Sequence, residues 1–246
     1  MAGLTDHPNP NQFSVFQSIV GQDNWTMTTV LDFLVKGGPV MVPVLGCSVL
    51  TIATGLERAL FWTRLLSREK RVVKEVLEAA RRDLTEAAAL ATQAQDLPIG
   101  RFLLAPLRLR EPSPETFSLA MEAAADKEFV QMRKGDKMLE TIVAVAPLLG
   151  LLGTVTGLIA TFSNLNIGGG GSADQATAAA AGIGEALITT AAGMVVAIMA
   201  LLVFRLMVSL QSQQMDYFSE AGSELELIYR QYWYEPQAAA RERLLR

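Results

Sequence analysis

The stretch that decides the fold is Ala178–Phe204, AAAAGIGEALITTAAGMVVAIMALLVF, in which Glu185 is the one charged residue. The nineteen residues after Glu185 carry no charge. A hydrocarbon core about 30 Å thick needs roughly 20 helical residues at about 1.5 Å each, so this stretch is long enough to span a membrane. It therefore predicts a transmembrane helix that carries a carboxyl group.

Two earlier stretches have the same character. Gly37–Leu56 is twenty residues without a charge, and Thr141–Ser163 is twenty-three. Of the 246 residues, 50% are hydrophobic and 19% are charged, and the mean hydropathy is +0.28. Buried helices of a soluble protein are the alternative, and three such stretches in so short a chain argue against it. We predict an all-α integral membrane protein with three transmembrane helices, two of them long and extending into the cytoplasm.

The basic residues predict the orientation. Of 21 Lys and Arg residues, 15 lie between Arg58 and Lys137 and five from Arg205 onward, whereas 164–184 has none. Basic residues near span ends favour the cytoplasmic side. We expect the N-terminus outside and the C-terminus inside. The expected segments are a periplasmic leader with a short amphipathic helix (1–36), the first span (37–62), a cytoplasmic helical segment (63–140), the second span (141–163), a periplasmic loop (164–176), the third span (177–207) and a cytoplasmic C-terminal helix and tail (208–246).

Helix-breaking residues predict finer boundaries. Pro39 is expected in the first turn of the first span. Residues 67–95 favour a helix, and 96–112, interrupted by Pro and Gly, favour a connector. Ser113-Pro114-Glu115 indicates a helix start, from which we expect one helix of about 50 residues through the second span. Pro147 is expected to kink it.

Glu185 is the strongest candidate for function. A charged side chain deep in a bilayer is costly and usually faces a bundle interior or a water path. The alternative is a carboxylate that reaches the outer headgroups. Thr189, Thr190, Thr154 and Thr156 are intramembrane hydroxyls that either bond to their own helix or form, with Glu185, the polar lining of a pore. The small residues expected to let helices approach closely are Gly150, Gly153, Gly157 and Gly193.

Other kinds of chemistry find no support in the sequence. His7 and Cys47 are each the single residue of their type, so there is no nucleophilic triad and no metal-ligand spacing. The Gly-rich loop lacks the Lys-Ser/Thr of a phosphate-binding loop. No basic-aromatic surface suits a nucleic acid. We expect no enzyme activity, no cofactor and no metal.

Three segments resemble the MotA/TolQ/ExbB proton channel family, and most closely its three-span ExbB/TolQ branch. They are LVKGGPVMVPVLGCSVLTIATGLERALFW (34–62), APLLGLLGTVTGLIATF (146–162) and GIGEALITTAAGMVVAIMALLVF (182–204). With the order and spacing of the spans, the resemblance covers about residues 30–215. MotA-like stators normally have four spans, whereas this chain is expected to have three.

The resemblance implies a homopentamer in the bacterial inner membrane, around single-span helices of an ExbD/TolR-like partner whose intramembrane Asp takes up and releases protons. Glu185, Thr154 and Thr190 match the positions that line this path; Thr189 replaces a residue that is usually small and apolar, and is a second candidate. Proton flow would turn the partner and energise a TonB-like protein that acts on outer-membrane transporters.

Alternatives remain at this point. A TolQ-like motor for envelope maintenance is one, because ExbB and TolQ sequences usually carry Trp where this chain has Thr156, although the long leader favours ExbB. A membrane scaffold that passes no protons is another. A secondary transporter is disfavoured, because the three spans contain no inverted repeat and no second buried charge pair.

Overall fold

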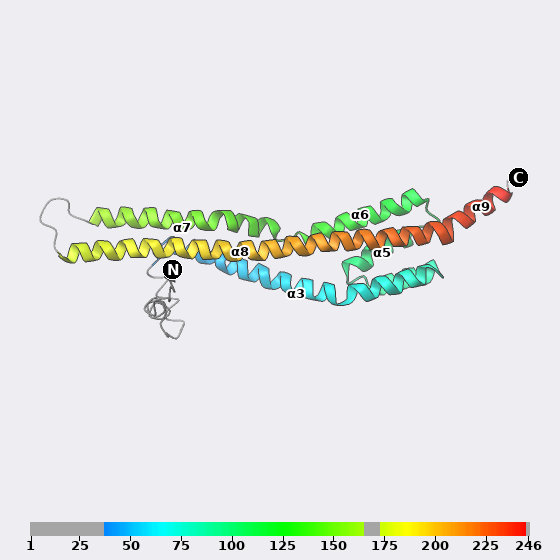
Figure 1. The fold of residues 1–246 in the computed structure, drawn as a ribbon, viewed down its shortest axis with the longest axis horizontal. Coiled ribbons are helices and arrows are strands. Elements are labelled where there is room, and N and C mark those ends of the chain that lie inside the picture. The colour runs from blue at the N-terminus through cyan, green and yellow to red at the C-terminus, as the bar shows by residue number, and fades with distance from the viewer. Residues whose placement is uncertain (1–36, 165–172, 245–246) are drawn as a thin grey trace, which may run out of the picture.

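The computed structural model describes residues 37–164 and 173–244, and within this part every regular element is a helix. The helices form an elongated bundle in which α8 runs along most of the length (Figure 1). The expected amphipathic helix in the leader lies outside the described residues. The elements are α3 (Met41–Ala80), α4 (Leu84–Gln93), α5 (Pro98–Leu107), α6 (Pro114–Met132), α7 (Asp136–Asn164), α8 (Ala173–Ile228), the π-helix η1 (Tyr229–Tyr234) and α9 (Glu235–Leu244).

Within the described residues, three helical stretches are long and apolar enough to cross a membrane, as the sequence predicts. They contain α3, α7 and α8. In each, an 18-residue apolar window is less than one third buried inside the chain, so most of its surface faces outward. A single soluble domain would not leave such surfaces uncovered. The chain is therefore an α-helical membrane protein.

The prediction of one helix of about 50 residues from Pro114 through the second span is wrong in its continuity. The structure has two helices, because α6 ends at Met132 and α7 begins at Asp136. Gly135 between them has a φ of +95°, a left-handed conformation that a helix interior does not allow and that glycine adopts at little cost. The long helices that extend beyond the spans are therefore α3, with 40 residues, and α8, with 56.

Two local predictions also need correction. Gly37–Val40 forms a turn and the first helix begins at Met41, so Pro39 precedes the helix instead of lying in its first turn. The expected connector 96–112 contains α5, which starts at Pro98 and is mostly buried. Apolar side chains such as Phe102 and Leu103 drive this segment into the core, and tertiary packing overrides the propensity of its proline and glycine residues.

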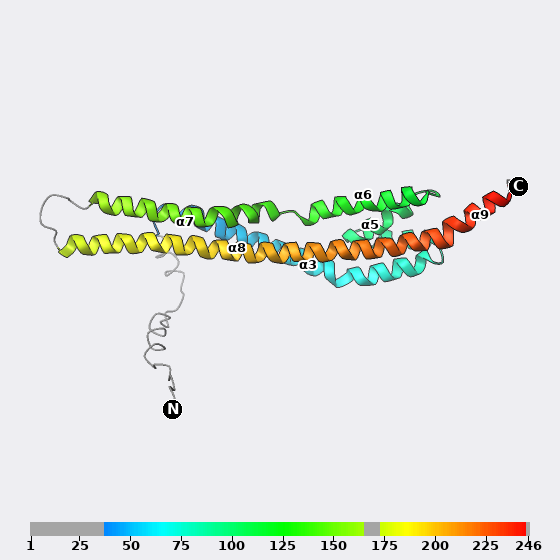
Figure 2. The ribbon, with the colours of Figure 1, turned by 45° about the horizontal axis from the view of Figure 1, so that its top comes forward.

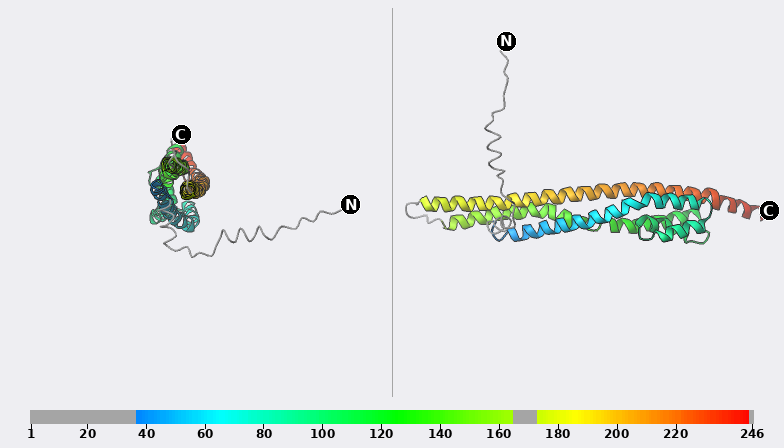
Figure 3. Two further views of the ribbon diagram at one scale, coloured as in Figure 1. Left: turned by 90° about the vertical axis from the view of Figure 1, so that its left-hand side faces the viewer. Right: turned by 90° about the horizontal axis from the view of Figure 1, so that it is seen from below.

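The second halves of α3 and α8, together with α4 to α6, η1 and α9, form a helical domain beyond the spans (residues 63–132 and 208–244, hereafter the distal domain; Figures 2 and 3). Its core joins Phe102, Phe117, Phe218 and Tyr229, and the rings of Phe117 and Tyr229 stack with centroids 4.2 Å apart. The Tyr229 hydroxyl donates to the Pro112 carbonyl at 2.6 Å. The distal domain thus has its own hydrophobic core, continuous with the spans through α3 and α8.

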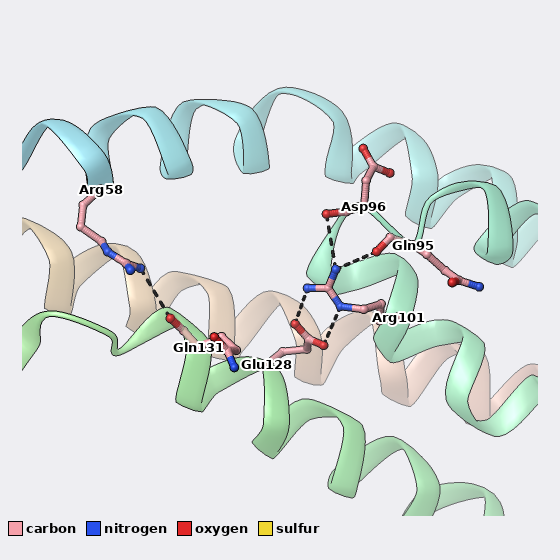
Figure 4. A network of polar contacts seen from close by, with 6 residues as sticks. All are labelled: Arg58, Gln95, Asp96, Arg101, Glu128 and Gln131. Atoms are coloured by element: carbon pink, nitrogen blue, oxygen red, sulfur yellow. Dashed lines mark hydrogen bonds and ion pairs between the residues drawn. The ribbon is translucent and has the colours of Figure 1, made fainter.

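The buried carboxylate of Glu128 in the distal domain is held by a specific partner. Glu128 is 4% exposed and receives two hydrogen bonds from the Arg101 guanidinium, at 2.8 and 2.6 Å (Figure 4). A fork of this kind is the strong geometry for an Arg–carboxylate pair, and the bond to Glu128 raises the pKa of Arg101. Arg101 also donates to the Gln95 carbonyl at 2.7 Å. This network fixes the start of α5 against α6.

Candidate functional site

A cavity of about 380 Å³ lies where the Gly37–Val40 turn meets α7 and α8. Glu185 contributes its carboxyl group to the lining, and it stays exposed in the single chain. The neighbouring turn passes close to it: Gly38 has a φ of +65°, and a Cβ placed there would lie 3.8 Å from the Glu185 Oε1 atom. The turn therefore lies within van der Waals reach of the carboxyl group, and its left-handed backbone at Gly38 favours glycine.

The hydroxyl groups of this cavity already use their hydrogen atoms. Thr189 is 1% exposed, and its Oγ1 donates to the Gly37 carbonyl at 2.9 Å. Thr156 donates to the Leu152 carbonyl of its own helix at 3.0 Å, and Thr161 donates to the Gly157 carbonyl at 2.9 Å. A hydroxyl has one hydrogen and two lone pairs. Toward the cavity these three groups are therefore hydrogen-bond acceptors.

The lining is thus rich in acceptors. It combines the Glu185 carboxyl with the lone pairs of three threonines, and none of the described lining residues is Lys, Arg or His. Such a surface suits water, a protonated carboxyl group or another proton donor. In the described ranges there is no group of three or more His, Cys, Asp and Glu side chains that could hold a metal ion. The arrangement fits the handling of protons better than metal or nucleophilic chemistry.

Two predicted site residues lie outside this lining. Thr190 donates from Oγ1 to the Gly150 carbonyl of α7 at 2.7 Å, so it bonds the two helices together. Thr154 bonds to the Leu151 carbonyl of its own helix at 2.7 Å. Both are partly exposed in the single chain. Thr190 follows Glu185 by five residues, which turns its side chain by roughly 140° around the helix.

The structure places the four predicted packing glycines where α7 meets α8. A Cβ on Gly150 would lie 3.0 Å from the Thr190 Cα, and one on Gly157 would lie 2.8 Å from the Ala186 Cβ. At Gly193 it would lie 2.6 Å from the Ala146 carbonyl oxygen, and Gly153 contacts Thr189 in the same way. Distances this short leave no space for a side chain. The two helices approach closely because these positions are glycine, which also brings the Glu185 face of α8 next to α7.

Pro147 lies inside α7, whose helix continues from Asp136 to Asn164. A proline removes one backbone donor and crowds the preceding turn, so a kink there stays a prediction. Sequence reasoning missed Thr161, which is 9% exposed and lines the cavity. The sequence feature that could have identified Thr161 is its hydroxyl group within the uncharged run 141–163, one helical turn after Gly157.

Comparison with known proteins identifies the family. The model of the MotA/TolQ/ExbB proton channel family matches residues 94–220, just over half of the chain. The chain belongs to this family. It is 70% identical over 207 residues to ExbB-like protein 1 of Synechocystis sp., covering 84% of this chain and 82% of the relative. A second Synechocystis protein, ExbB-like protein 3, is 39% identical over 201 residues, covering 82% of this chain and 95% of the relative.

More distant relatives share a smaller region. The biopolymer transport protein ExbB of Xanthomonas campestris is 35% identical over 106 residues, 43% of this chain and 41% of that protein. The matched family is one of proton channels and motor components rather than of known enzymes. This membership agrees with the acceptor-lined cavity at Glu185 and confirms the resemblance to the ExbB/TolQ branch. The chain is thus an ExbB-like membrane component of a proton-driven motor.

Proposed function

We propose that this chain is the pore-forming subunit of an inner-membrane motor driven by the proton-motive force. The observation that carries the proposal is the Glu185 carboxyl, held in a cavity of hydroxyl acceptors within an otherwise uncharged span. An intramembrane carboxyl is by default a candidate functional site, and proton relays are among the functions that such groups serve. Thr189 belongs to the same cavity. Thr154 and Thr190 stay in the proposed path, because both are partly exposed and keep oxygen lone pairs for a proton donor.

The proposed orientation has the distal domain in the cytoplasm and the connection between α7 and α8 in the periplasm. It rests on the concentration of Lys and Arg in 58–137, at the span ends that the positive-inside rule weighs most. In this orientation Glu185 lies in the outer half of its span, since it follows the expected start of the span at residue 177 by eight residues, about 12 Å of a core about 30 Å thick. Protons would then enter the Glu185 cavity from the periplasmic side.

The partners follow from the single-chain geometry and the family. Apolar side chains of α3, α7 and α8 are exposed, among them Leu56, Leu148 and Leu202, so lipid and other subunits have surface to cover. We infer a homopentamer around the single-span helices of an ExbD/TolR-like partner, which faces Glu185 with its own carboxyl. The ExbB-type role, in which the motor energises a TonB-like protein and outer-membrane transport, is the form we propose, since the relatives described above are ExbB-like.

The test is Glu185→Gln, which keeps the size and removes the titratable group. We expect it to assemble normally and to lose coupled transport by about 100-fold or more, the contribution of one proton-transferring side chain, in cells that depend on this chain. The control is Glu140→Gln, which removes an exposed carboxyl near the start of α7. Wild-type coupled transport in Glu185→Gln cells would contradict the assigned site.

The native mass of the complex, extracted in mild detergent with its natural neighbours, tests the assembly. Five copies of the chain with a small single-span protein support the motor. A monomer or an even-numbered ring, together with an activity that survives collapse of the proton gradient, favours the scaffold without proton conduction.

A further inference from the structure

A second carboxyl group is buried in the contact between α3 and α8, within the distal domain. Glu69 is 3% exposed and Gln214 is 2% exposed, and the Gln214 Nε2 donates to the Glu69 Oε1 at 2.9 Å. Gln214 follows Glu185 by 29 residues on α8, about 43 Å along the helix. The pair is therefore separate from the cavity at Glu185. Its chemistry needs its own explanation.

The other oxygen of each group is the unusual feature. Within the described residues, the Glu69 Oε2 and the Gln214 Oε1 are buried and have no hydrogen-bond partner. An ionised carboxylate only accepts hydrogen bonds, and so does the oxygen of a side-chain amide. A buried acceptor without a donor has lost its hydrogen bonds to water and has none within the protein, which destabilises the folded state. The pair has two unmatched acceptors and lacks one donor.

One proton on Glu69 supplies that donor. A protonated carboxyl has one O–H and one carbonyl oxygen, which match the oxygen and the N–H of an amide. We propose that Glu69 and Gln214 form a second proton-binding site, in which the neutral carboxyl of Glu69 donates to the side-chain oxygen of Gln214, and that loss of this proton weakens the contact between α3 and α8. The site stands on this contact alone, whether or not Glu185 conducts protons.

The groups that act on Glu69 favour the protonated form overall. Burial, the largest effect, raises the pKa of Glu69, while the hydrogen bond from Gln214 and the charge of exposed Lys70 oppose it. From α8, Tyr217 is a neutral neighbour, because burial, the largest effect, raises the pKa of Tyr217 to about 12, with added effects from the charge of Glu220 and from that of Glu69 whenever Glu69 is ionised. Lys70 is the cation that acts on Glu69, and it does so from the surface.

Three charged groups on α3, α5 and α7 are bound by partners of their own. The pairs are Arg68 with Asp96 at 2.8 Å, Arg101 with Glu128 at 2.6 Å, and Asp136 with the amide of Gln211 at 2.9 Å. Each of these charges is already satisfied by its partner. A proton is the simplest ligand that completes the Glu69–Gln214 pair without adding charge to a buried site.

The sign of the pH effect follows from the raised pKa of Glu69. The folded chain holds this proton more tightly than the unfolded chain, in which the pKa of a glutamate is about 4.3. The contribution to stability is complete below that pH and is lost as the pH rises through the folded pKa. Between the two values, each pH unit raises the unfolding equilibrium constant up to about tenfold through this one group.

Infrared difference spectroscopy of the full-length chain in detergent tests the protonation directly. As the pH is raised from about 4, the carbonyl band of one protonated carboxyl should persist after those of exposed carboxyls have gone, and Glu69→Gln should lack that component. The control is Glu78→Gln, on the same helix with its carboxylate exposed, which should keep the band. A spectrum that is identical in the wild type and in Glu69→Gln overturns the proposal.

Unfolding measured as a function of pH tests the consequence. The Glu69→Gln side chain is neutral and offers both an N–H and an oxygen to Gln214, so this variant should fold and lose the fall in stability with rising pH. Glu78→Gln should keep the wild-type profile. Failure of Glu69→Gln to fold, or a pH profile like that of the wild type, contradicts the site, since a neutral partner of the same size should replace the protonated carboxyl.

Discussion

The close contact of α7 with α8 predicts opposite effects for two glycine-to-alanine changes on one helix. A Cβ on Gly193 would lie 2.6 Å from the Ala146 carbonyl oxygen and 3.0 Å from the Gly150 Cα. A Cβ on Gly184 would meet nothing within 4 Å. Gly193→Ala should therefore force α7 and α8 apart, whereas Gly184→Ala should leave their packing unchanged.

The magnitudes follow from two effects. Overpacking costs about 1–3 kcal/mol, and the upper part of this range applies at Gly193 because backbone atoms are the obstacle. Replacing glycine in a helix returns up to about 1 kcal/mol. The net free energy of unfolding should fall by about 2 kcal/mol in Gly193→Ala and rise by up to about 1 kcal/mol in Gly184→Ala.

Cys47 provides the assay. It is the single cysteine of the chain, and it packs partly buried against the cluster that contains Ala146, Val196 and Ala200. Separation of α7 from α8 exposes it to a thiol-reactive dye, whose fluorescence follows thermal unfolding in detergent. At about 2–4 °C per kcal/mol for a chain of this size, Gly193→Ala should lower Tm by about 4–8 °C and Gly184→Ala should not lower it.

The test is the difference in Tm between Gly193→Ala and Gly184→Ala. A Tm for Gly193→Ala equal to that of Gly184→Ala would refute the reasoning, because it would mean that α7 does not pack against Gly193. A loss of Tm in both variants would refute it too, since the space beside Gly184 would then be filled.

Two further predictions concern the distal domain and its junction with the spans. Arg101→Met leaves the buried Glu128 carboxylate without its partner and should lower the free energy of unfolding by about 2 kcal/mol, less than for a fully buried pair because Arg101 is half-exposed. In urea unfolding, the double variant Arg101→Met/Glu128→Leu should regain most of this loss. Equal stability of the single and double variants would contradict a buried charge at Glu128. Gly135→Ala must place a Cβ at a φ of +95° and 3.1 Å from the Thr54 Cγ2. It should lower the free energy of unfolding by about 1–2 kcal/mol, and an unchanged Tm would mean that the α6–α7 break tolerates a side chain.

The helical spans were predictable because membrane crossing depends on local composition. Inside lipid every backbone N–H and C=O group needs a hydrogen-bond partner within the protein, and a run of about twenty uncharged residues provides these partners by forming a helix. The spans in α3, α7 and α8 could therefore be placed from the sequence. Glu185 could be singled out as a candidate for the same reason, since one carboxyl stands out in such a run, and its role stays a prediction. The family motifs around Thr154 and Thr190 added the proton-channel assignment, which the comparisons support.

Tertiary structure decided what depends on contacts between distant residues. The helix at Pro98 forms because Phe102 and Leu103 reach a core, and no local signal outweighs its prolines. Which hydroxyls share the cavity with Glu185 depends on how α7 and α8 pack; therefore Thr161 joins the cavity and Thr190 bonds to Gly150 instead.

The Glu69–Gln214 pair shows the same limit most clearly. The two residues are 145 positions apart, and in the sequence Glu69 lies in a charged segment that looks like a solvent-exposed helix face. Only the packing of α3 on α8 buries it. Sequence determines which segments enter the membrane and where a charge stands alone within one, because those effects are local; which charges become buried is set by the fold, because burial is a property of neighbours that the chain brings together from far apart.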